Sequence, residues 1–310
     1  MGDVVSPIVL TKGLQAHFVK AYLAAMAWWP KIATEVPSSS SQEKYGWLGS
    51  SPAMREWTDE RVPKGLLDHE YTIVNKDWES TIAVDRNAFK DDQLGAVQIR
   101  VQDLASRARV HPNSLLSTLI IDGESTLCYD GQFFFDTDHV EGESGTQSND
   151  LTYNASDPNA VTQAEFASAF EAAREKLAGF KDDRGEPFHE NAASSLIVMV
   201  PPALWGVGEK TLEQDTLAGN ESNVLKGAYE LLVNPHLTDG TKWYLFKTDS
   251  YILPFILQMR EMVKLLQVGV KEGEDVDYVR FMRKHMFFGA EARYNVGYGL
   301  WQNAVLTTFV

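Results

Sequence analysis

The amino-acid sequence predicts an α+β fold. Stretches with the apolar spacing of helices and short apolar runs typical of strands both occur, but they do not alternate regularly along the chain. A doubly wound parallel sheet would require that alternation, so we expect helical and sheet regions to be partly separate. The 310 residues suffice for one large core or two modest ones. The sequence contains no internal repeat.

The first 40 residues predict one helix followed by a hinge. Thr11 is a suitable N-cap for a helix over residues 11–29. Apolar side chains at helical spacing form one stripe along this segment, namely Leu14, Phe18, Tyr22, Ala25 and Trp29. Pro30 predicts the end of the helix, and Pro37 followed by four serines predicts the hinge.

The segment over residues 43–57, EKYGWLGSSPAMREW, is the most informative part of the chain. It combines three large aromatic residues with charges of both signs, two glycines and a proline. Such a segment is too apolar for a disordered linker and too charged for a core. Aromatic residues beside arginine are typical of protein–protein contact surfaces. We therefore expect this segment to contact another copy of the same chain.

The candidates for inter-subunit contact come from this segment, from the charges that follow it and from a tryptophan further along. They are Glu43, Tyr45, Trp47, Arg55, Trp57, Glu60, Arg61 and Trp78. A competing interpretation is that Trp47 and Trp57 cover the core of their own subunit, and that the charges form a solvated run that contributes little. The charges gain importance if the contact repeats around a closed assembly.

A β-hairpin is predicted directly after this segment. Residues 71–74 form its first strand and residues 75–77 its turn. Alternate residues of the second strand, Trp78, Ser80, Ile82 and Val84, share one face. Residues 43–91 are thus expected to form an extended, charge-rich ribbon that needs a partner surface for stability.

The longest helical pattern covers residues 92–121. Asp92 is a suitable N-cap, and His111 with Pro112 predicts an interruption before the pattern continues. A loop rich in glycine and aspartate follows over residues 129–158. Thr162 and Glu165 then form a capping box that begins the next helix.

The C-terminal half predicts mostly strands. Residues 195–200 form an apolar run that two prolines end, which is typical of a buried strand. Residues 203–217 favour a helix. Further strands are expected over residues 243–246, 255–258, 264–268 and 303–309.

Composition and charge exclude several functions. The net charge is −15, and residues 129–161 hold seven carboxylates without a lysine or arginine, so tight binding to nucleic acid is not expected. No apolar run reaches the length of a membrane span, and the N-terminus lacks the pattern of a signal peptide. The single cysteine, Cys128, excludes an internal disulfide and indicates a reducing compartment.

The best candidate for chemistry is Asp136, Asp138 and His139, which could together bind a metal ion. The three lack a fourth ligand at a known spacing, and the neighbouring phenylalanines favour a packed structural loop. Cys128 has no activating partner and is expected to be a small buried side chain. The sequence therefore predicts no catalytic residue, cofactor or metal.

Four segments, in this order, resemble the Mu-like phage major head subunit (gpT) family. They are EKYGWLGSSPAMREW at 43–57, NKDWEST at 75–81, DDQLG at 91–95 and LCYDGQFFFDTDH at 127–139. Four motifs in register are more specific than any one of them. The resemblance covers nearly the whole chain and is sharpest in its first half.

The resemblance implies a Hong Kong 97-type phage capsid fold with four parts. These are an N-terminal arm (1–40), an extended loop (41–91), a peripheral domain with a spine helix (92–194 and 263–310) and an axial domain (195–262). It further implies self-assembly into hexamers and pentamers of an icosahedral shell that encloses double-stranded DNA, as part of a virion assembled in the bacterial cytoplasm. Portal, scaffold and decoration proteins are expected partners, with only weak, non-specific contact to DNA and no membrane contact.

Two alternatives to a phage capsid protein remain, and they differ from it in cargo or in chemistry. An encapsulin-like shell would share the fold but enclose protein. A metal-dependent hydrolase would use Asp136, Asp138 and His139, and would lose activity rather than assembly on Asp136→Ala.

Overall fold

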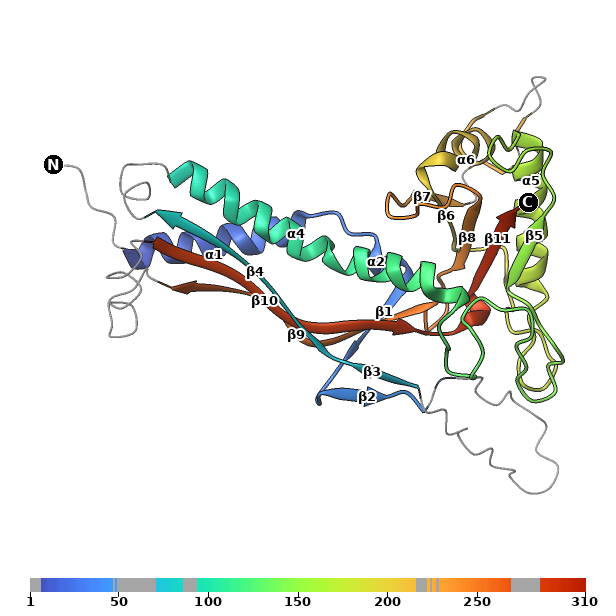
Figure 1. The fold of residues 1–310 in the computed structure, drawn as a ribbon, viewed down its shortest axis with the longest axis horizontal. Coiled ribbons are helices and arrows are strands. Elements are labelled where there is room, and N and C mark those ends of the chain that lie inside the picture. Colours follow the sequence, from blue (N-terminus) through green and yellow to red (C-terminus); the bar gives the residue numbers. More distant parts are fainter. Residues whose placement is uncertain are drawn as a thin grey trace.

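The computed structural model describes residues 7–46, 48, 71–85, 94–215, 222–223, 225–226, 229–268 and 285–310. For residues 7–12 and 94 it describes the backbone but not the side chains. The chain forms an elongated limb joined to a compact module (Figure 1). The predicted N-cap at Asp92 and most of the predicted extended loop lie outside the described residues.

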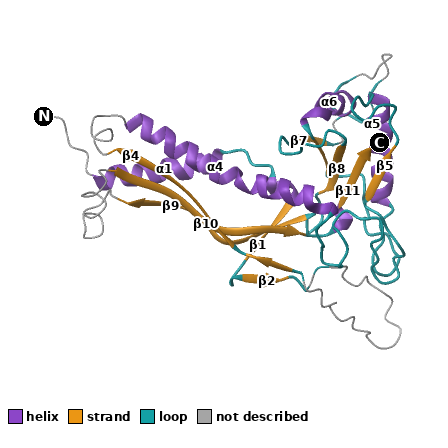
Figure 2. Cartoon of the chain, viewed as in Figure 1, coloured by secondary structure: helices purple, strands orange, loops and turns teal. Residues whose placement is uncertain are grey.

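The limb consists of two long helices on one side of a four-stranded sheet (Figure 2). Its elements are α1 (Pro7–Ala24), α4 (Leu94–Ile121), β1 (Ala33–Pro37), β4 (Lys76–Asp85), β9 (Phe255–Val268) and β10 (His285–Tyr298). The strand order is β1-β9-β10-β4, with β1 parallel to β9 and β10 antiparallel to both its neighbours. Short elements flank the sheet, namely α2 (Trp29–Ile32) and the two-stranded ribbon of β2 (Gln42–Lys44) and β3 (Thr72–Val74).

The module is a five-stranded sheet in the order β5-β11-β8-β6-β7, with two helices. Its elements are β5 (Asp150–Tyr153), α5 (Gln163–Ala178), β6 (Leu196–Val200), α6 (Trp205–Leu212), β7 (Glu230–Val233), β8 (Lys242–Lys247) and β11 (Ala304–Phe309). The described part of the chain also contains three short 3₁₀ helices, at Asp122–Glu124, Pro202–Leu204 and Trp301–Asn303.

The limb core forms where the apolar faces of helix and strand meet. Phe18 of α1 packs with Val101 and Leu104 of α4 against Phe288 and Ala290 of β10. The β10 residues are spaced by two, and the α4 residues by three, so each set lies on one face of its element. The opposite face of the sheet is therefore turned away from both helices.

Aromatic rings join the limb to the module. Phe134 stacks on Tyr298 at the end of β10, with 4.5 Å between ring centroids, and contacts Phe255 at 5.2 Å. Phe255, the first residue of β9, also lies 5.5 Å from Phe246 of β8. The larger hydrophobic core is thus continuous across the junction.

The N-terminal helix differs from its prediction. α1 begins at Pro7 rather than at Thr11 and ends at Ala24, so Trp29 belongs to α2. Pro30 lies in the first turn of α2, where its missing N–H would have no intrahelical partner, so it begins a helix instead of ending one. The predicted hinge at Pro37 is also wrong in part, because Pro37 is the last residue of β1 and pairs with Met259.

The predicted interruption of the long helix is wrong. α4 runs for 28 residues with Pro112 inside it. A proline inside a helix costs about 3 kcal/mol, because one backbone hydrogen bond is lost and the proline ring clashes with the carbonyl group four residues earlier. Buried side chains on both sides, such as Val101 and Leu116, hold the two halves in one line and offset that cost.

The predicted hairpin over residues 71–84 is wrong in its pairing. β3 pairs with β2, whereas β4 continues onward and pairs with β10. Asn75, between them, is held by hydrogen bonds from its Nδ2 to Ser38 Oγ and Ser40 O, each 2.8 Å, so the chain is not free to reverse. The shared inner face of Trp78, Ile82 and Val84 is confirmed by their burial.

Other elements confirm or extend the predictions. The capping box of Thr162 and Glu165 begins α5, and β6, β8 and β11 lie where strands were expected. β5 lies inside the predicted loop, and β9 is one strand where two were predicted. The predicted axial range supplies β6, β7 and β8, but β5 and β11 complete the same sheet.

Candidate inter-subunit surface

Three of the eight predicted contact residues lie in the described part of the chain, Glu43, Tyr45 and Trp78. The other five, Trp47, Arg55, Trp57, Glu60 and Arg61, lie outside it.

Glu43 organises a turn within its own subunit. Its Oε1 accepts hydrogen bonds from the backbone N–H groups of Ser39 (2.7 Å) and Ser40 (3.0 Å) and from Ser38 Oγ (3.0 Å). These bonds, first those from the two backbone groups, lower the pKa of the Glu43 carboxyl. Glu43 thereby fixes the connection between β1 and β2.

Tyr45 is part of the core of its own subunit. Only 2% of its surface is exposed, and its hydroxyl donates to Gln258 Oε1 at 2.8 Å. Gln258 Nε2 in turn donates to Ile73 O and Asn75 Oδ1, which ties the β2–β3 ribbon to β9. The structure therefore leaves Tyr45 almost no side-chain surface for a neighbouring subunit. The sequence could not show this, because the burial depends on a residue more than 200 positions away.

Trp78 is half-buried at the edge of the limb. Its Nε1 donates to Tyr294 O at 2.9 Å, and its ring lies 4.6 Å from that of His111. Trp78, His111 and Tyr294 line part of a groove of about 200 Å³ between α4 and the sheet, with Leu104 and Val263 on its other walls. Trp78 thus combines contacts in its own subunit with a surface that faces the groove.

Sequence reasoning missed two exposed apolar patches on the limb. Val19 and Leu23 are exposed on α1, and Met26 is exposed just after that helix ends. Met262, Leu266 and Val268 are exposed on β9. The i, i+4 spacing of Val19 and Leu23 was a signal in the sequence, on the side of the helix opposite Leu14 and Phe18.

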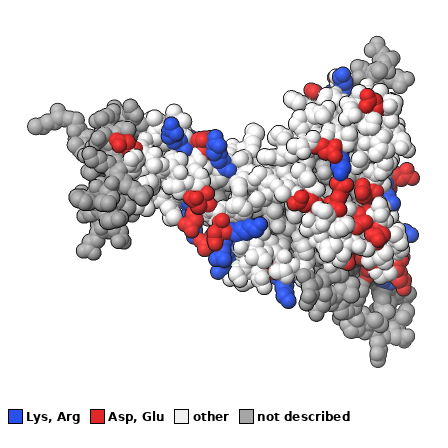
Figure 3. Space-filling view, viewed as in Figure 1, with Lys and Arg blue, Asp and Glu red and all other residues white. Residues whose placement is uncertain are grey.

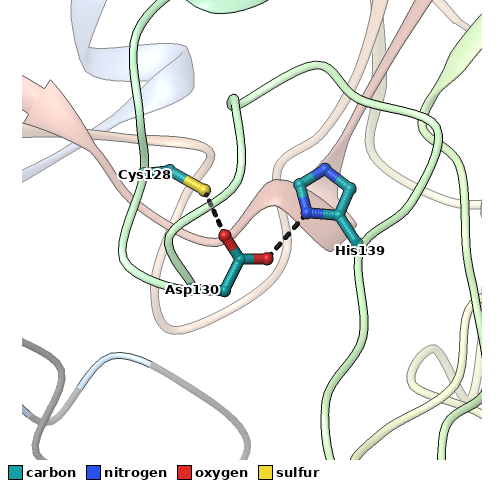
Figure 4. Close-up of side chains that lie close together, drawn as sticks. All are labelled: Cys128, Asp130 and His139. Carbon is teal, nitrogen blue, oxygen red and sulfur yellow. Dashed lines mark hydrogen bonds and ion pairs between the residues drawn. The ribbon is translucent and has the colours of Figure 1, made fainter.

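The three predicted metal ligands do not form one cluster, because the side chains of Asp136 and Asp138 interact with each other whereas that of His139 is directed to Asp130. Asp136 accepts the backbone N–H groups of Thr137 and Phe133, which shapes its own turn. Asp138 is exposed, whereas His139 is buried and points toward Asp130. Among the described residues, the close group of metal-ligating types is instead Cys128, Asp130 and His139 (Figure 4).

This group is a closed hydrogen-bond network around Asp130. Its Oδ1 accepts from Cys128 Sγ and from the N–H of Gln132, each at 3.0 Å, and its Oδ2 lies 2.7 Å from His139 Nδ1. Burial opposes the charge of Asp130, but the bond from His139 and the charge of His139 outweigh it, so the pKa of Asp130 is lowered. Burial, and then the Asp130 carboxylate, raise the pKa of the Cys128 thiol.

The geometry of the network favours a structural role. His139 also bonds through Nε2 to Asn149 Oδ1 (3.2 Å), and its ring stacks on Trp301 at 4.1 Å. A protonated thiol is a poor metal ligand and a poor nucleophile. The network therefore fastens the loop after α4 to the 3₁₀ helix that precedes β11.

None of the helices described here has both the length and the apolar character needed to cross a membrane.

A limb of long helices on a twisted sheet, joined to a compact sheet module, is the architecture of phage capsid subunits. The chain is similar to the capsid subunit in the procapsid of bacteriophage JBD30, with a TM-score of 0.58 and 27% identity over 97% of this chain and 74% of that one. The fold is thus that of a major capsid protein.

The chain belongs to the family of the Mu-like prophage major head subunit gpT, whose sequence profile matches residues 8–166, 160–237 and 238–308. It is 25% identical to the Mu-like prophage FluMu major head subunit of Haemophilus influenzae over 94% of this chain. It is 28% identical to the major capsid protein of Escherichia phage Mu over 89%. The chain spans 70% of the Haemophilus protein and 64% of the Mu protein. The family is one of structural capsid proteins, not of enzymes, and the chain is a component of a virion.

Proposed function

We propose that this chain assembles, as hexamers and pentamers, into an icosahedral shell that encloses double-stranded DNA. The observation that carries the proposal is the family match, which extends over nearly the whole chain, together with a capsid fold over the same residues. Assembly would take place in the bacterial cytoplasm, which fits a chain whose single cysteine is buried and reduced.

We further propose a division of labour within the subunit. Residues 1–40 form the arm, residues 41–91 the extended loop that lies over a neighbour, and α4 the spine of the peripheral domain. The module supplies the axial contacts of each hexamer and pentamer. Its sheet recruits β5 and β11 as well as strands of 195–262, which supports an axial domain that also includes 150–153 and 304–309.

The expected partners beyond the chain itself are portal, scaffold and decoration proteins. Contact with packaged DNA is proposed to be weak and non-specific, because a net charge of −15 does not favour binding to phosphate.

Negative-stain electron microscopy of the purified chain tests the proposal. Closed particles are expected from the unmodified chain, whereas soluble aggregates or monomers alone would count against self-assembly. Nucleic acid rather than protein cargo inside particles from infected cells would separate this shell from an encapsulin-like compartment.

The proposed role of the extended loop has its own test. Arg55→Glu with Arg61→Glu is expected to leave the subunit folded and to block shells, because reversed charges repel their partners on the neighbour. The matched control is Arg55→Lys with Arg61→Lys, which keeps both charges and should still assemble. If the Glu variant forms normal particles, Arg55 and Arg61 do not contribute to the contact between subunits.

A further inference from the structure

β4 lies at the edge of the limb sheet along its whole length. On one side it pairs with β10, in an unbroken register from Lys76 to Asp85. No other strand in the described part of the chain pairs with its second side. Every second residue of an antiparallel strand turns its backbone N–H and C=O groups away from the neighbouring strand. A row of these groups on β4 therefore faces outward, where the backbone of another extended strand can bind them.

The edge of β4 lacks most of the features that keep soluble proteins from pairing through a strand. Those features are a short strand, a proline, a bulge or charged side chains. β4 has ten residues without a proline, and its register with β10 shows no shift. Its middle part, residues 80–84, is uncharged and rich in residues that favour strands. This middle part is thus suited to pair with a further strand.

The charged residues of β4 lie outside its middle part, at Lys76, Asp77, Glu79 and Asp85. Asp77 is paired within its own subunit, with Arg293 at 3.2 Å. Glu79 accepts a hydrogen bond from Thr81 Oγ1 at 3.0 Å. Figure 3 shows acidic side chains beside basic ones over the strands of the limb, so this face carries no block of one sign.

The sequence of β4 limits how two copies of the strand can pair. In an antiparallel pair of identical strands, the two-fold axis passes between two copies of the same residue, because directly opposite residues turn their backbone groups the same way. Two registers pair nearly the whole strand, one centred on Ser80 and one centred on Thr81. The register centred on Thr81 places Asp77 opposite Asp85 at both ends, and like charges in that relation are unfavourable.

The register centred on Ser80 is self-complementary. It places Trp78 opposite Ile82 on both sides of the axis and Glu79 opposite Thr81, and no charge faces another charge. An aromatic residue opposite a β-branched one is a favourable cross-strand pair. Trp78 and Ile82 are both half-buried, and Trp78 lines the groove of about 200 Å³ under α4. Ile82 of the second copy would therefore lie beside the part of Trp78 that its own subunit leaves uncovered.

We propose that β4 of one subunit pairs antiparallel with β4 of a second copy, about a two-fold axis at Ser80, and joins the two limb sheets into one. This inference rests on the proposed self-assembly, to which it adds a contact. The contact is isologous and closes after two copies, so it joins two neighbouring rings and cannot itself build a ring. The two-fold axis is perpendicular to the sheet, so α1 and α4 of both copies lie on the same face of the joined sheet.

Disulfide formation at the axis tests the pairing. In Ser80→Cys the two new thiols belong to directly opposite residues, whose Cα atoms are about 4.5–5.5 Å apart, a separation that a disulfide can span. Assembled protein is oxidised by air with copper–phenanthroline, and a non-reducing denaturing gel is expected to show a dimer and no larger product. Ser80 is exposed, so the subunit should fold unchanged, and Cys128 is buried and contributes no background.

A second variant makes the test independent of the class of opposite pair at Ser80. Opposite residues alternate between pairs with and without backbone hydrogen bonds, so the neighbouring pair is of the other class. Glu79→Cys with Thr81→Cys places a thiol opposite a thiol in that neighbouring pair, on exposed positions. This double variant is also expected to give a dimer and no larger product, because both of its disulfides join the same two subunits.

Thr81→Cys alone is the matched control. Thr81 is exposed and lies one residue from the axis, but in the proposed register its two copies are diagonal neighbours about 7–8 Å apart, too far for a disulfide. This variant is expected to remain monomeric on the gel. A dimer from Thr81→Cys without one from Ser80→Cys would overturn the proposed register.

The outcomes separate the pairing from the proposed shell. If particles form but neither Ser80→Cys nor the Glu79→Cys, Thr81→Cys double variant gives dimers, the pairing is wrong and self-assembly stands. If dimers form but the unmodified chain gives no closed particles, the pairing stands and the proposed shell is contradicted. Absence of both dimers and particles would overturn both.

Discussion

At the scale of single residues, two histidines are held in environments that disfavour their charged form. Burial lowers the pKa of His111, whose Nδ1 lies 2.7 Å from the Tyr294 hydroxyl and whose ring packs on Trp78. Burial also lowers the pKa of His189, against the opposing effect of its bond from Nε2 to Gln302 O at 2.8 Å. Both therefore prefer to be neutral in the folded subunit.

These shifts predict that the subunit loses stability in mild acid. A histidine with a lowered folded pKa contributes stability above its unfolded pKa of about 6.5, and that contribution is lost as the pH falls through the folded pKa. The midpoint of thermal unfolding is expected to fall between about pH 7 and 5, and less steeply in His111→Gln. His236→Gln is the control, because His236 is exposed, and its slope should match the unmodified chain. An unchanged slope in His111→Gln would contradict the prediction.

At the scale of elements, Arg109 fastens the N-terminal segment to the spine helix. Its guanidinium carbon lies 5.3 Å from the ring centroid of Tyr22 and 5.0 Å from that of Trp29. Asn113, one turn further along α4, accepts a hydrogen bond through Oδ1 from the backbone N–H of Trp29 at 3.0 Å. One turn of α4 thus holds the connection between α1 and α2.

We predict that Arg109→Ala loosens α1 from α4. The loss of two cation–π contacts at a partly desolvated site is expected to cost about 1–2 kcal/mol. Hydrogen exchange of the amides of α1 should accelerate, while exchange in the module stays unchanged. Arg107→Ala is the matched control. Arg107 makes an exposed i,i+4 pair with Asp103, and its loss should cost less than about 0.5 kcal/mol. Equal effects of the two variants would show that Arg109 is not the fastening.

The elements also show which parts of the fold a sequence can predict. The beginning of α5 was predictable because Thr162 and Glu165 cap it through bonds three residues apart. The partner of β4 was not, because residues 285–294 lie some two hundred positions later and mix Phe, Arg and Glu without a clear pattern. The same reason separates the candidate contact residues. Composition marked Tyr45 and Trp78 as aromatic residues in a ribbon, but it could not show that they bond to the distant residues Gln258 and Tyr294 of their own subunit.

At the scale of the whole molecule, charge sets the relation between the subunit and the DNA that the proposed shell encloses. The chain has 43 acidic and 28 basic residues. Residues 129–161 concentrate seven carboxylates in the loop that reaches the module. Binding to duplex DNA gains its free energy from cations that displace counterions, and this loop offers none. Asp130 and Glu141 are buried, but the other five carboxylates are at least partly exposed, and a surface of that charge would let packaged DNA slide rather than adhere.

We predict that subunits and empty particles do not bind a fluorescent DNA duplex measurably at physiological salt. Asp138, Glu143 and Asp157 are exposed, and replacing all three by Lys tests whether their charge is the reason. If each new lysine contacts a phosphate, the slope of log K against log salt approaches about −2.7, which is three times −0.9. Fluorescence anisotropy at several salt concentrations measures both the affinity and the slope. The control variant removes the three negative charges without adding positive ones, by Asp138→Asn, Glu143→Gln and Asp157→Asn together. A steep slope in the unmodified chain would mean that clustered lysines and arginines elsewhere bind the phosphate backbone. The prediction that the subunit does not bind DNA would then be wrong.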